Sequence, residues 1–207
     1  LFRSQLILTF TGLSDPVYAL TASGWQEWAV GMNGRPVQVG DDIWYYAREG
    51  VYRLDPATQT AQLLYQLPPS FLGLGSIIAL PAGGALLAHQ DLDDNRLIRF
   101  DAAGAVQWER SYVSLDAGSP QLLLHAGQPY LLLQSDSSVT MQLNLYTIDQ
   151  QNSTLHHIFT GGTRQSSTGG DWAVSINDAL LLVNVGGGSM TALDGGTTVS
   201  LTNPAAN

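Results

Sequence analysis

DLDDNRLIRFDAAGAVQWER, residues 91–110, is the stretch that decides the fold of this chain. It reads as an acidic loop, a short strand over 96–100, a tight turn with Gly104 and a second strand carrying Trp108. The same phrase, a short strand ending in Asp, recurs at residues 51–55, 145–149 and 190–194, with a degenerate copy at 17–21. The anchor positions 21, 55, 101, 149 and 194 lie 34 to 48 residues apart, which indicates a repeat architecture.

Each repeat consists of short strands joined by turns that carry Gly or Pro. The strands fall into five groups, near residues 1–30, 35–67, 75–112, 121–159 and 171–201. Continuous apolar runs such as 77–80 and 131–133 occupy the first two strands of the complete groups, whereas the last two strands are more polar. A period in the forties with a buried inner pair of strands predicts an all-β propeller of four-stranded antiparallel blades.

The number of strands bears on the size of the ring. Five repeats are visible over 1–207, and the first has three strands where the others have four. A missing strand is contributed by the other end of the chain or reflects truncation, and Pro204 weakens any strand after residue 201. The sequence favours one propeller domain that is part of a larger ring of about six to eight blades over a closed five-bladed ring. Because no leader of signal-peptide form is visible at Leu1, we expect a mature or partial chain.

Composition excludes several classes of function. Eight Lys and Arg residues stand against 17 Asp and Glu, and no basic run exists, so nucleic acid is not an expected partner. The absence of Cys excludes disulfides, thiolate metal sites and a Cys nucleophile. No apolar run reaches the roughly 18 residues of a membrane span. Only 12% of residues are charged, a habit of turn-rich β proteins outside the cell, so we expect an extracytoplasmic or secreted protein.

The phrase LIRFDAAGAVQW, residues 97–108, resembles the repeat of the PQQ-like (quinoprotein-type) β-propeller family. That repeat has a strand ending in Asp, a turn with Gly and a Trp several residues on. VYALTASGW, residues 17–25, is a second match with Thr21 in place of the Asp, and 51–58 matches with Tyr65 at the aromatic position. The motif is shared by WD40-like propellers, so the resemblance implies the propeller fold and not a quinone cofactor. The anchor Asp has a structural role of its own, because it accepts N–H groups of the turn it opens.

The densest aromatic group comprises Trp25, Trp28, Trp44, Tyr45, Tyr46 and Tyr52. Alternation along a strand places Trp44 and Tyr46 on one face and Tyr45 on the other. We expect most of this group to pack between blades, and an exposed pair would offer a contact surface for a sugar or a protein.

The acidic loop is a candidate cation site. Asp91, Asp93 and Asn95 place oxygen ligands at positions 1, 3 and 5, which is how a calcium loop opens. Arg96 stands where the sharp-turn Gly of such a loop belongs, and Ala102 where the bidentate Glu belongs. Calcium is therefore the one cofactor that the sequence raises, and the departures favour a solvated acidic hairpin instead.

Two classes of function stay open. One is a non-catalytic propeller that binds a protein or glycan, or that serves as a scaffold contacting other subunits or further parts of its own polypeptide. The other is a quinoprotein-like or hydrolytic enzyme with a site at the central channel, which requires convergent ionisable groups. The apolar inner strands offer only His89 and His125 as such groups, so the sequence favours binding and assigns no catalytic residue.

Binding is expected on one rim of the propeller. Strand direction brings the connections between blades, at 67–74, 113–120 and 160–170, to the same end as the hairpin loops at 48–50, 91–95 and 135–139. The predicted binding residues on this rim are Asp91, Asp93, Asp94, Asn95, Asp116, Asp136 and Arg164. An acidic rim favours a basic or a neutral hydroxyl-rich partner, and salt should slow association with a charged one.

Overall fold

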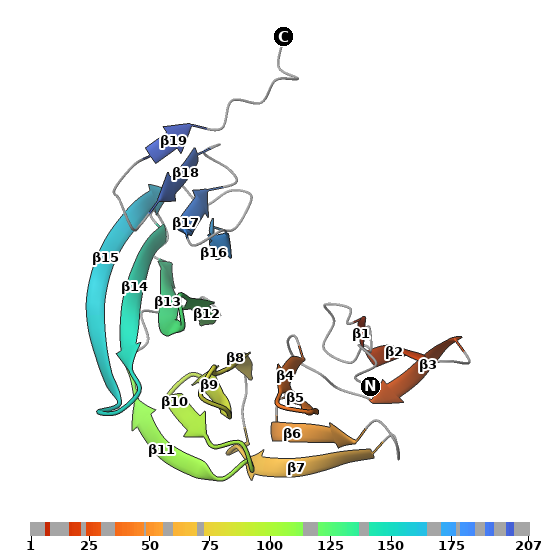
Figure 1. The fold of residues 1–207 in the computed structure, drawn as a ribbon. Helices are drawn as coiled ribbons and strands as arrows, with labels where there is room; N and C mark the ends of the chain where they lie inside the picture. Colours follow the sequence, from red (N-terminus) through yellow and green to blue (C-terminus); the bar gives the residue numbers. More distant parts are fainter. Residues whose placement is uncertain are drawn as a thin grey trace. The chain divides into compact units, whose positions relative to one another are not determined.

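A computed structural model of the chain confirms the all-β class, since its described residues form strands and turns (Figure 1). It describes residues 7–8, 17–21, 24–29, 36–47, 49–55, 60–69, 73–113, 120–136, 141–164, 171–176, 179–184, 189–192 and 198–200. In these ranges there is no helix long and apolar enough to cross a membrane. The chain divides into two compact units, 1–113 and 114–207, each of which is described by itself. The expectation of one domain over 1–207 stays a prediction.

The first unit holds three antiparallel sheets. The smallest contains β1 (Ile7–Leu8), β2 (Val17–Thr21) and β3 (Gly24–Ala29). The next contains β4 (Val37–Val39), β5 (Asp42–Ala47), β6 (Gly50–Asp55) and β7 (Thr60–Gln66). The third contains β8 (Leu74–Ala79), β9 (Ala85–Gln90), β10 (Asn95–Phe100) and β11 (Val106–Ser111). In each sheet the strands lie in chain order, as a meander does.

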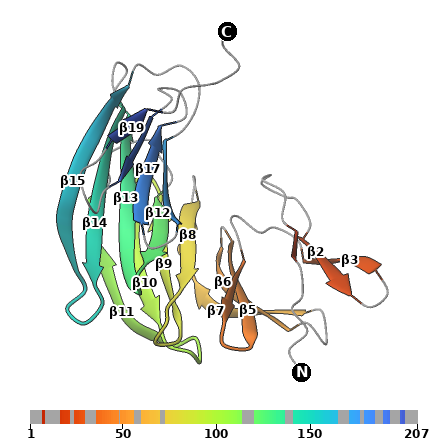
Figure 2. The ribbon, with the colours of Figure 1, turned by 45° about the horizontal axis from the view of Figure 1, so that its top comes forward.

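The second unit holds two four-stranded antiparallel sheets. One contains β12 (Gln121–His125), β13 (Gln128–Asp136), β14 (Met141–Asp149) and β15 (Thr154–Arg164), which lie side by side in Figure 2. The other contains β16 (Asp171–Ile176), β17 (Ala179–Asn184), β18 (Ser189–Ala192) and β19 (Thr198–Ser200). All strand pairs between described residues lie within the five sheets of the chain. The prediction of four-stranded propeller blades is confirmed, and the size of the ring stays a prediction.

Burial follows the predicted division into inner and outer strands. All six residues of β9 are buried, whereas most residues of β7 and β11 are exposed. In the second unit Leu131, Leu132 and Leu133 of β13 are buried as well. Continuous apolar runs form these inner strands because both of their faces leave water, and that burial is the main favourable term in folding.

The core of the first unit lies between two of its blades. Trp44 and Tyr46 of β5 pack with Leu87 of β9 and Phe100 of β10 in one cluster of buried side chains. Trp44 is completely buried and meets Phe100 edge to face, with ring centroids 6.2 Å apart. This is a favourable geometry for two aromatic rings, and it joins neighbouring sheets through side chains alone.

The opposite face of β5 carries a separate cluster. Tyr45 packs with Leu54 there and stacks on Tyr52, with ring centroids 5.2 Å apart. Burial raises the pKa of Tyr45 to about 12, so its hydroxyl stays protonated at physiological pH. The predicted alternation of faces along β5 is therefore confirmed. Tyr45 of the stacked pair is buried in the core, and Tyr52 is half-buried against it.

Tyr46 also reaches across to the next blade through its hydroxyl group. The hydroxyl donates to the carbonyl of Leu74 (3.3 Å) and lies 3.0 Å from Nδ1 of His89. Its ring lies over Gly75, where an added Cβ would come within 2.7 Å of a ring carbon of Tyr46. His89 is only 1% exposed, and its carbonyl accepts a hydrogen bond from the hydroxyl of Tyr112 (3.0 Å). The side chain of Tyr46 on β5 thus contacts both β8 and β9 of the next blade.

The close approach at Gly75 predicts a destabilising substitution. Gly75→Ala should lower the free energy of unfolding by about 1–3 kcal/mol, because the new methyl group overlaps the ring of Tyr46 and a backbone oxygen. Urea denaturation measures the change. Gly40→Ala is the control, since nothing lies within 4 Å of its Cβ position and only the positive φ of 61° opposes it. A Gly75→Ala variant as stable as the natural protein would contradict this contact.

Buried His89 predicts a dependence of stability on pH. Burial lowers the pKa of His89 below its ordinary value of about 6.5, against the weaker opposing effects of Asp94 and Asp91. As pH falls below 6.5 the unfolded chain binds a proton that the folded chain does not, so the free energy of unfolding should fall. Urea denaturation at several pH values between 7.5 and 5 measures this contribution.

His89→Asn supplies the comparison. The amide group of Asn can take the place of the imidazole Nδ1, and it does not titrate. In this variant the free energy of unfolding should decrease less as the pH falls than in the natural protein. In His125→Asn it should decrease as much as in the natural protein. If His89→Asn retained the full decline, His89 would not be its source.

Candidate functional site

The structure brings together three of the predicted loops at one end of the first unit. Leu67, which starts a connection between blades, donates its N–H to the carbonyl of Glu49 (2.8 Å) in the β5–β6 hairpin. The connection ends at Leu74, which pairs with Gln90 just before the β9–β10 hairpin. Strand direction predicts this grouping. Each connection between blades begins and ends at the same end of the strands as the hairpins that join the second and third strands of a blade.

The β9–β10 hairpin, residues 91–94 with Asn95 at the start of β10, is closed by backbone hydrogen bonds. Asp91 donates its N–H to the carbonyl of Asp94 (2.9 Å), and Tyr112 donates to the carbonyl of Asn95 (3.0 Å). Asp91 and Asp94 are half-buried, while Leu92 and Asp93 at the tip are exposed. The loop therefore presents one apolar and one acidic side chain to solvent.

An ionic network fixes the base of this hairpin. Arg96 pairs with Asp94 and with Glu109 (2.6 Å), and the hydroxyl of Tyr65 donates to the other oxygen of Glu109 (2.9 Å). Hydrogen bonds from Arg96 to Asp94 and Glu109 hold the pKa of its guanidinium above the ordinary value. Asp94 therefore braces the loop, and the exposed carboxylate at its tip is that of Asp93.

The calcium hypothesis gains no support from the geometry. Across the described ranges, no group of three or more His, Asp and Glu side chains is arranged to hold a metal ion. Asp93 lies exposed at the tip, while Oδ1 of Asn95 is buried and has no hydrogen-bond partner in the described part of the chain. We therefore assign no metal site to this loop.

The other predicted rim residues are placed only in part. Asp116 lies outside the described residues. Asp136 ends β13 and Arg164 ends β15, and both pair with Met141, so their backbones lie at the same end of one sheet. Their side chains are outside the described set. Because the two units are described separately, the single acidic rim stays a prediction.

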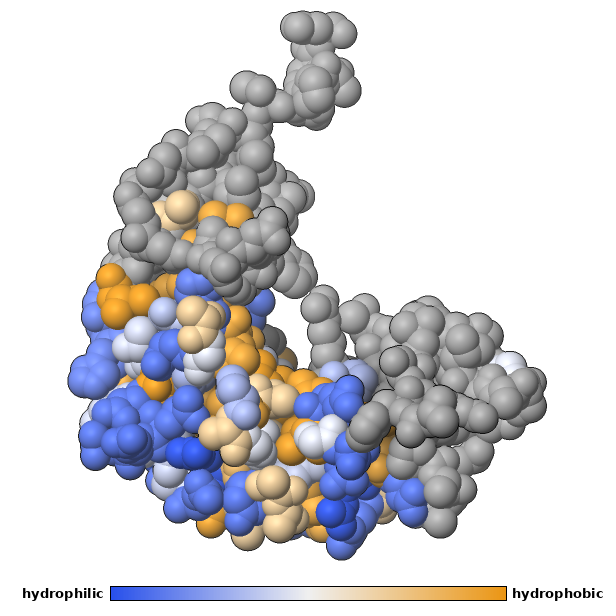
Figure 3. Space-filling model, viewed as in Figure 1, coloured by the Kyte–Doolittle hydropathy of each residue, from blue (hydrophilic) through white to orange (hydrophobic). Residues whose placement is uncertain are grey.

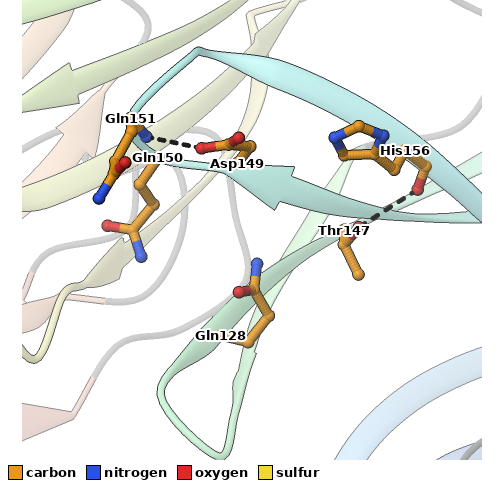
Figure 4. A pocket seen from close by; sticks show the side chains of 6 residues that line it. All are labelled: Gln128, Thr147, Asp149, Gln150, Gln151 and His156. Carbon is orange, nitrogen blue, oxygen red and sulfur yellow. Dashed lines mark hydrogen bonds between the residues drawn. The ribbon is translucent and has the colours of Figure 1, made fainter.

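The second unit contains a polar hollow that the sequence analysis did not predict. Its volume is about 460 Å³, and its lining comprises Gln128, Thr147, Asp149, Gln150, Gln151 and His156 (Figure 4). Thr147 pairs with His156 across β14 and β15, and Asp149 lies two residues further along the same face. The turn between β14 and β15 appears as a hydrophilic group of residues in Figure 3.

Tight turns hold two sides of this hollow. Ala126 and Gly127 join β12 to β13 with φ values of 48° and 78°, the left-handed pair that a two-residue hairpin requires. Gln128 follows at once, and its amide group donates to the carbonyls of Ile148 (2.8 Å) and Pro129 (3.1 Å). These two bonds use the amide nitrogen. The side-chain oxygen takes no part in them and can accept a hydrogen bond from a ligand.

Asp149 anchors the turn on the other side. Its Oδ1 accepts the N–H groups of Gln151 (2.8 Å) and Asn152 (3.1 Å), and its Oδ2 accepts from the side-chain amide of Asn152 (2.9 Å). These hydrogen bonds hold the pKa of the Asp149 carboxyl below its usual value. Asp101 accepts the N–H groups of its own turn in the same way. The structural role predicted for the anchor Asp is confirmed at these two positions.

The hollow lies at the opposite end of the blade from the predicted binding loops. Gln128 begins β13, whereas Asp136, one of the predicted rim residues, ends it. No motif marks the six lining residues, because they come from three strands and the β14–β15 turn, and the strand register brings them together. The polar run from Asp149 to Asn152 is the signal in the sequence that could have indicated this hollow.

Comparison with known proteins identifies the fold but no family. No family model and no curated protein matches the sequence. A protein of unknown function from Bacteroides caccae superposes with a TM-score of 0.61 at 12% identity, over 97% of this chain and 73% of that one. An auxiliary nutrient binding protein from Bacteroides thetaiotaomicron VPI-5482 superposes with a TM-score of 0.58 at 10% identity, over 95% of this chain and 53% of that one.

The chain spans about three quarters of the first of these structures and about half of the second. At 10–12% identity the likeness is one of architecture. This chain therefore shares the repeated antiparallel-sheet fold of the two Bacteroides proteins.

Proposed function

We propose that this chain is a non-catalytic binding module that holds a protein partner at the β9–β10 hairpin. The observation that carries the proposal is Leu92, which is 64% exposed at the tip of a loop closed by its own backbone and braced by Arg96. A partner that buries a large, rigidly held apolar side chain removes it from water, and this burial favours binding. Full burial of a Leu side chain contributes about 1.5–3 kcal/mol.

The surroundings of Leu92 fit a protein partner. Val113 is 80% exposed and directly follows Tyr112, whose N–H binds the carbonyl of Asn95 at the base of the hairpin. Asp93, next to Leu92 in the loop, adds an exposed negative charge. An apolar pocket bordered by Lys or Arg on the partner would complement this combination.

The bracing of the loop favours affinity. A loop that is already ordered loses little conformational entropy on binding, and the Asp94–Arg96–Glu109–Tyr65 network supplies that order. The individual pairs are partly exposed, so each contributes at most about 1 kcal/mol to stability. Their main contribution here is to fix the position of Leu92 and Asp93.

Charge and comparison support binding as the role of the chain. A formal net charge of −9 would attract a basic partner and raise the association rate at low salt. An auxiliary nutrient binding protein has the same architecture, so the fold is used for binding elsewhere. An extracytoplasmic location and a scaffold role that contacts other subunits or further parts of the polypeptide belong to the same proposal.

A capture experiment tests this surface. The tagged natural protein and a Leu92→Ser, Asp93→Asn double variant are each incubated with extract from the native source, and the recovered proteins are quantified by mass spectrometry. We expect at least one protein to be recovered roughly tenfold less by the variant, since loss of a buried Leu contact and a charge pair costs more than 1.4 kcal/mol. High salt should lower recovery by the natural protein.

Leu63→Ser is the matched control, because Leu63 is 42% exposed in the same unit and belongs to another sheet, on β7. It should recover the same partners as the natural protein. Equal recovery by all three proteins would mean that the hairpin is not the binding surface.

A further inference from the structure

We propose that the hollow at the β14–β15 turn is a second binding site, which takes a neutral polyhydroxyl ligand of the size of a mono- or disaccharide. The site lies in the second unit and uses Gln128, Thr147, Asp149, Gln150, Gln151 and His156. It does not depend on the partner surface of the first unit. Nothing in the sequence motifs pointed to it.

Size and shape are the first argument. A volume of about 460 Å³ falls within the range of small-molecule sites, roughly 300–1,000 Å³. Figure 4 shows side chains on opposite sides of the space, with Gln128 facing the turn residues Asp149, Gln150 and Gln151 across it. Such a space admits a sugar ring and lets polar groups meet it from both sides.

The hydrogen-bonding capacity of the lining is the second argument. The oxygen of Gln128 keeps its acceptor capacity, since both amide hydrogens are already donated to carbonyls. The exposed side chain of Gln151 offers a carbonyl and an amide group. His156 lies 3.3 Å through Nε2 from the hydroxyl of Thr154, which leaves Nδ1 as its second polar atom. Hydroxyl groups, which both donate and accept, are the ligand groups that suit such a mixed set.

The charge of the lining is the third argument. Asp149 is the only carboxylate among the six lining residues, and three protein groups already donate to it. An anionic ligand would meet its negative charge, and a metal cation would find a single acidic ligand. A neutral hydroxyl needs only the remaining lone pair of this carboxylate. The lining therefore disfavours anions and offers too few acidic ligands for a metal cation.

The rigidity of the lining is the fourth argument. Asp149 orders its own turn, the Ala126–Gly127 hairpin fixes the start of β13, and Gln128 ties that strand to β14. The hydroxyl of Thr147 donates to the carbonyl of His156 (3.4 Å), which holds the two strands in register under the hollow. Polar groups held in this way need little ordering when a weak neutral ligand binds.

Nuclear magnetic resonance of the side-chain amides provides the test, because three of the lining residues are glutamines. The ¹⁵N-labelled natural protein is titrated with glucose, galactose, mannose, maltose and cellobiose up to about 20 mM, a range that detects millimolar dissociation constants. We expect saturable shifts of the Gln128, Gln150 and Gln151 amide signals with at least one sugar. Gln151→Ala should weaken that binding about five- to tenfold, which corresponds to the loss of one or two hydrogen bonds.

Gln107→Ala is the matched control, since Gln107 is an exposed glutamine on β11 of the other unit. It should leave sugar binding unchanged, and both variants should keep the thermal stability of the natural protein. Glycerol and lysine at the same concentration serve as comparison ligands. Absence of saturable shifts with every sugar, equal shifts with glycerol, or stronger shifts with lysine would each overturn the proposal. Capture of a protein partner through Leu92 is measured separately, so the failure of one proposal leaves the other intact.

Discussion

The reach of Tyr46 from one blade into the next is the contact on which the first unit depends. No strand pairing joins its sheets in the described residues, so side-chain contacts such as this one hold them together. The ring of Tyr46 fits over Gly75, and its hydroxyl meets Leu74 and buried His89. Tight packing and a satisfied polar group thus occur at one point. An unpaired imidazole at the same depth would cost free energy.

Burial of the inner strands leaves the strand ends and turns for function. All of β9 is buried, so no side chain on that strand is free to meet a ligand. Both candidate sites accordingly use hairpins: the partner surface uses the β9–β10 hairpin, and the hollow uses the turns that precede β13 and follow β14. This division follows from packing sheets face to face, because only the ends of such strands reach water with fixed geometry.

Aspartate has three different roles among the described residues, and neighbouring groups decide which. Asp93 has no described partner and remains an exposed charge, while Asp94 beside it is paired with Arg96. Asp101 and Asp149 bind the N–H groups of the turns they open. The acidic character of the chain is therefore partly structural. Counting carboxylates along the sequence overstates the negative charge available to a partner.

The sequence by itself determined the all-β class, the four-stranded blades, the opposite faces of Trp44 and Tyr45, and the turn role of the anchor aspartates. These features depend on local chemistry, on the alternation of side chains every two residues and on a repeat of about forty-five residues. All three can be recognised in the sequence itself. Only the tertiary structure decided that Asp94 is paired with Arg96 and Glu109, and that Gln128 meets Asp149 and His156 around one hollow. Strand register creates those meetings, and a shift of one residue would turn every side chain to the other face of its sheet.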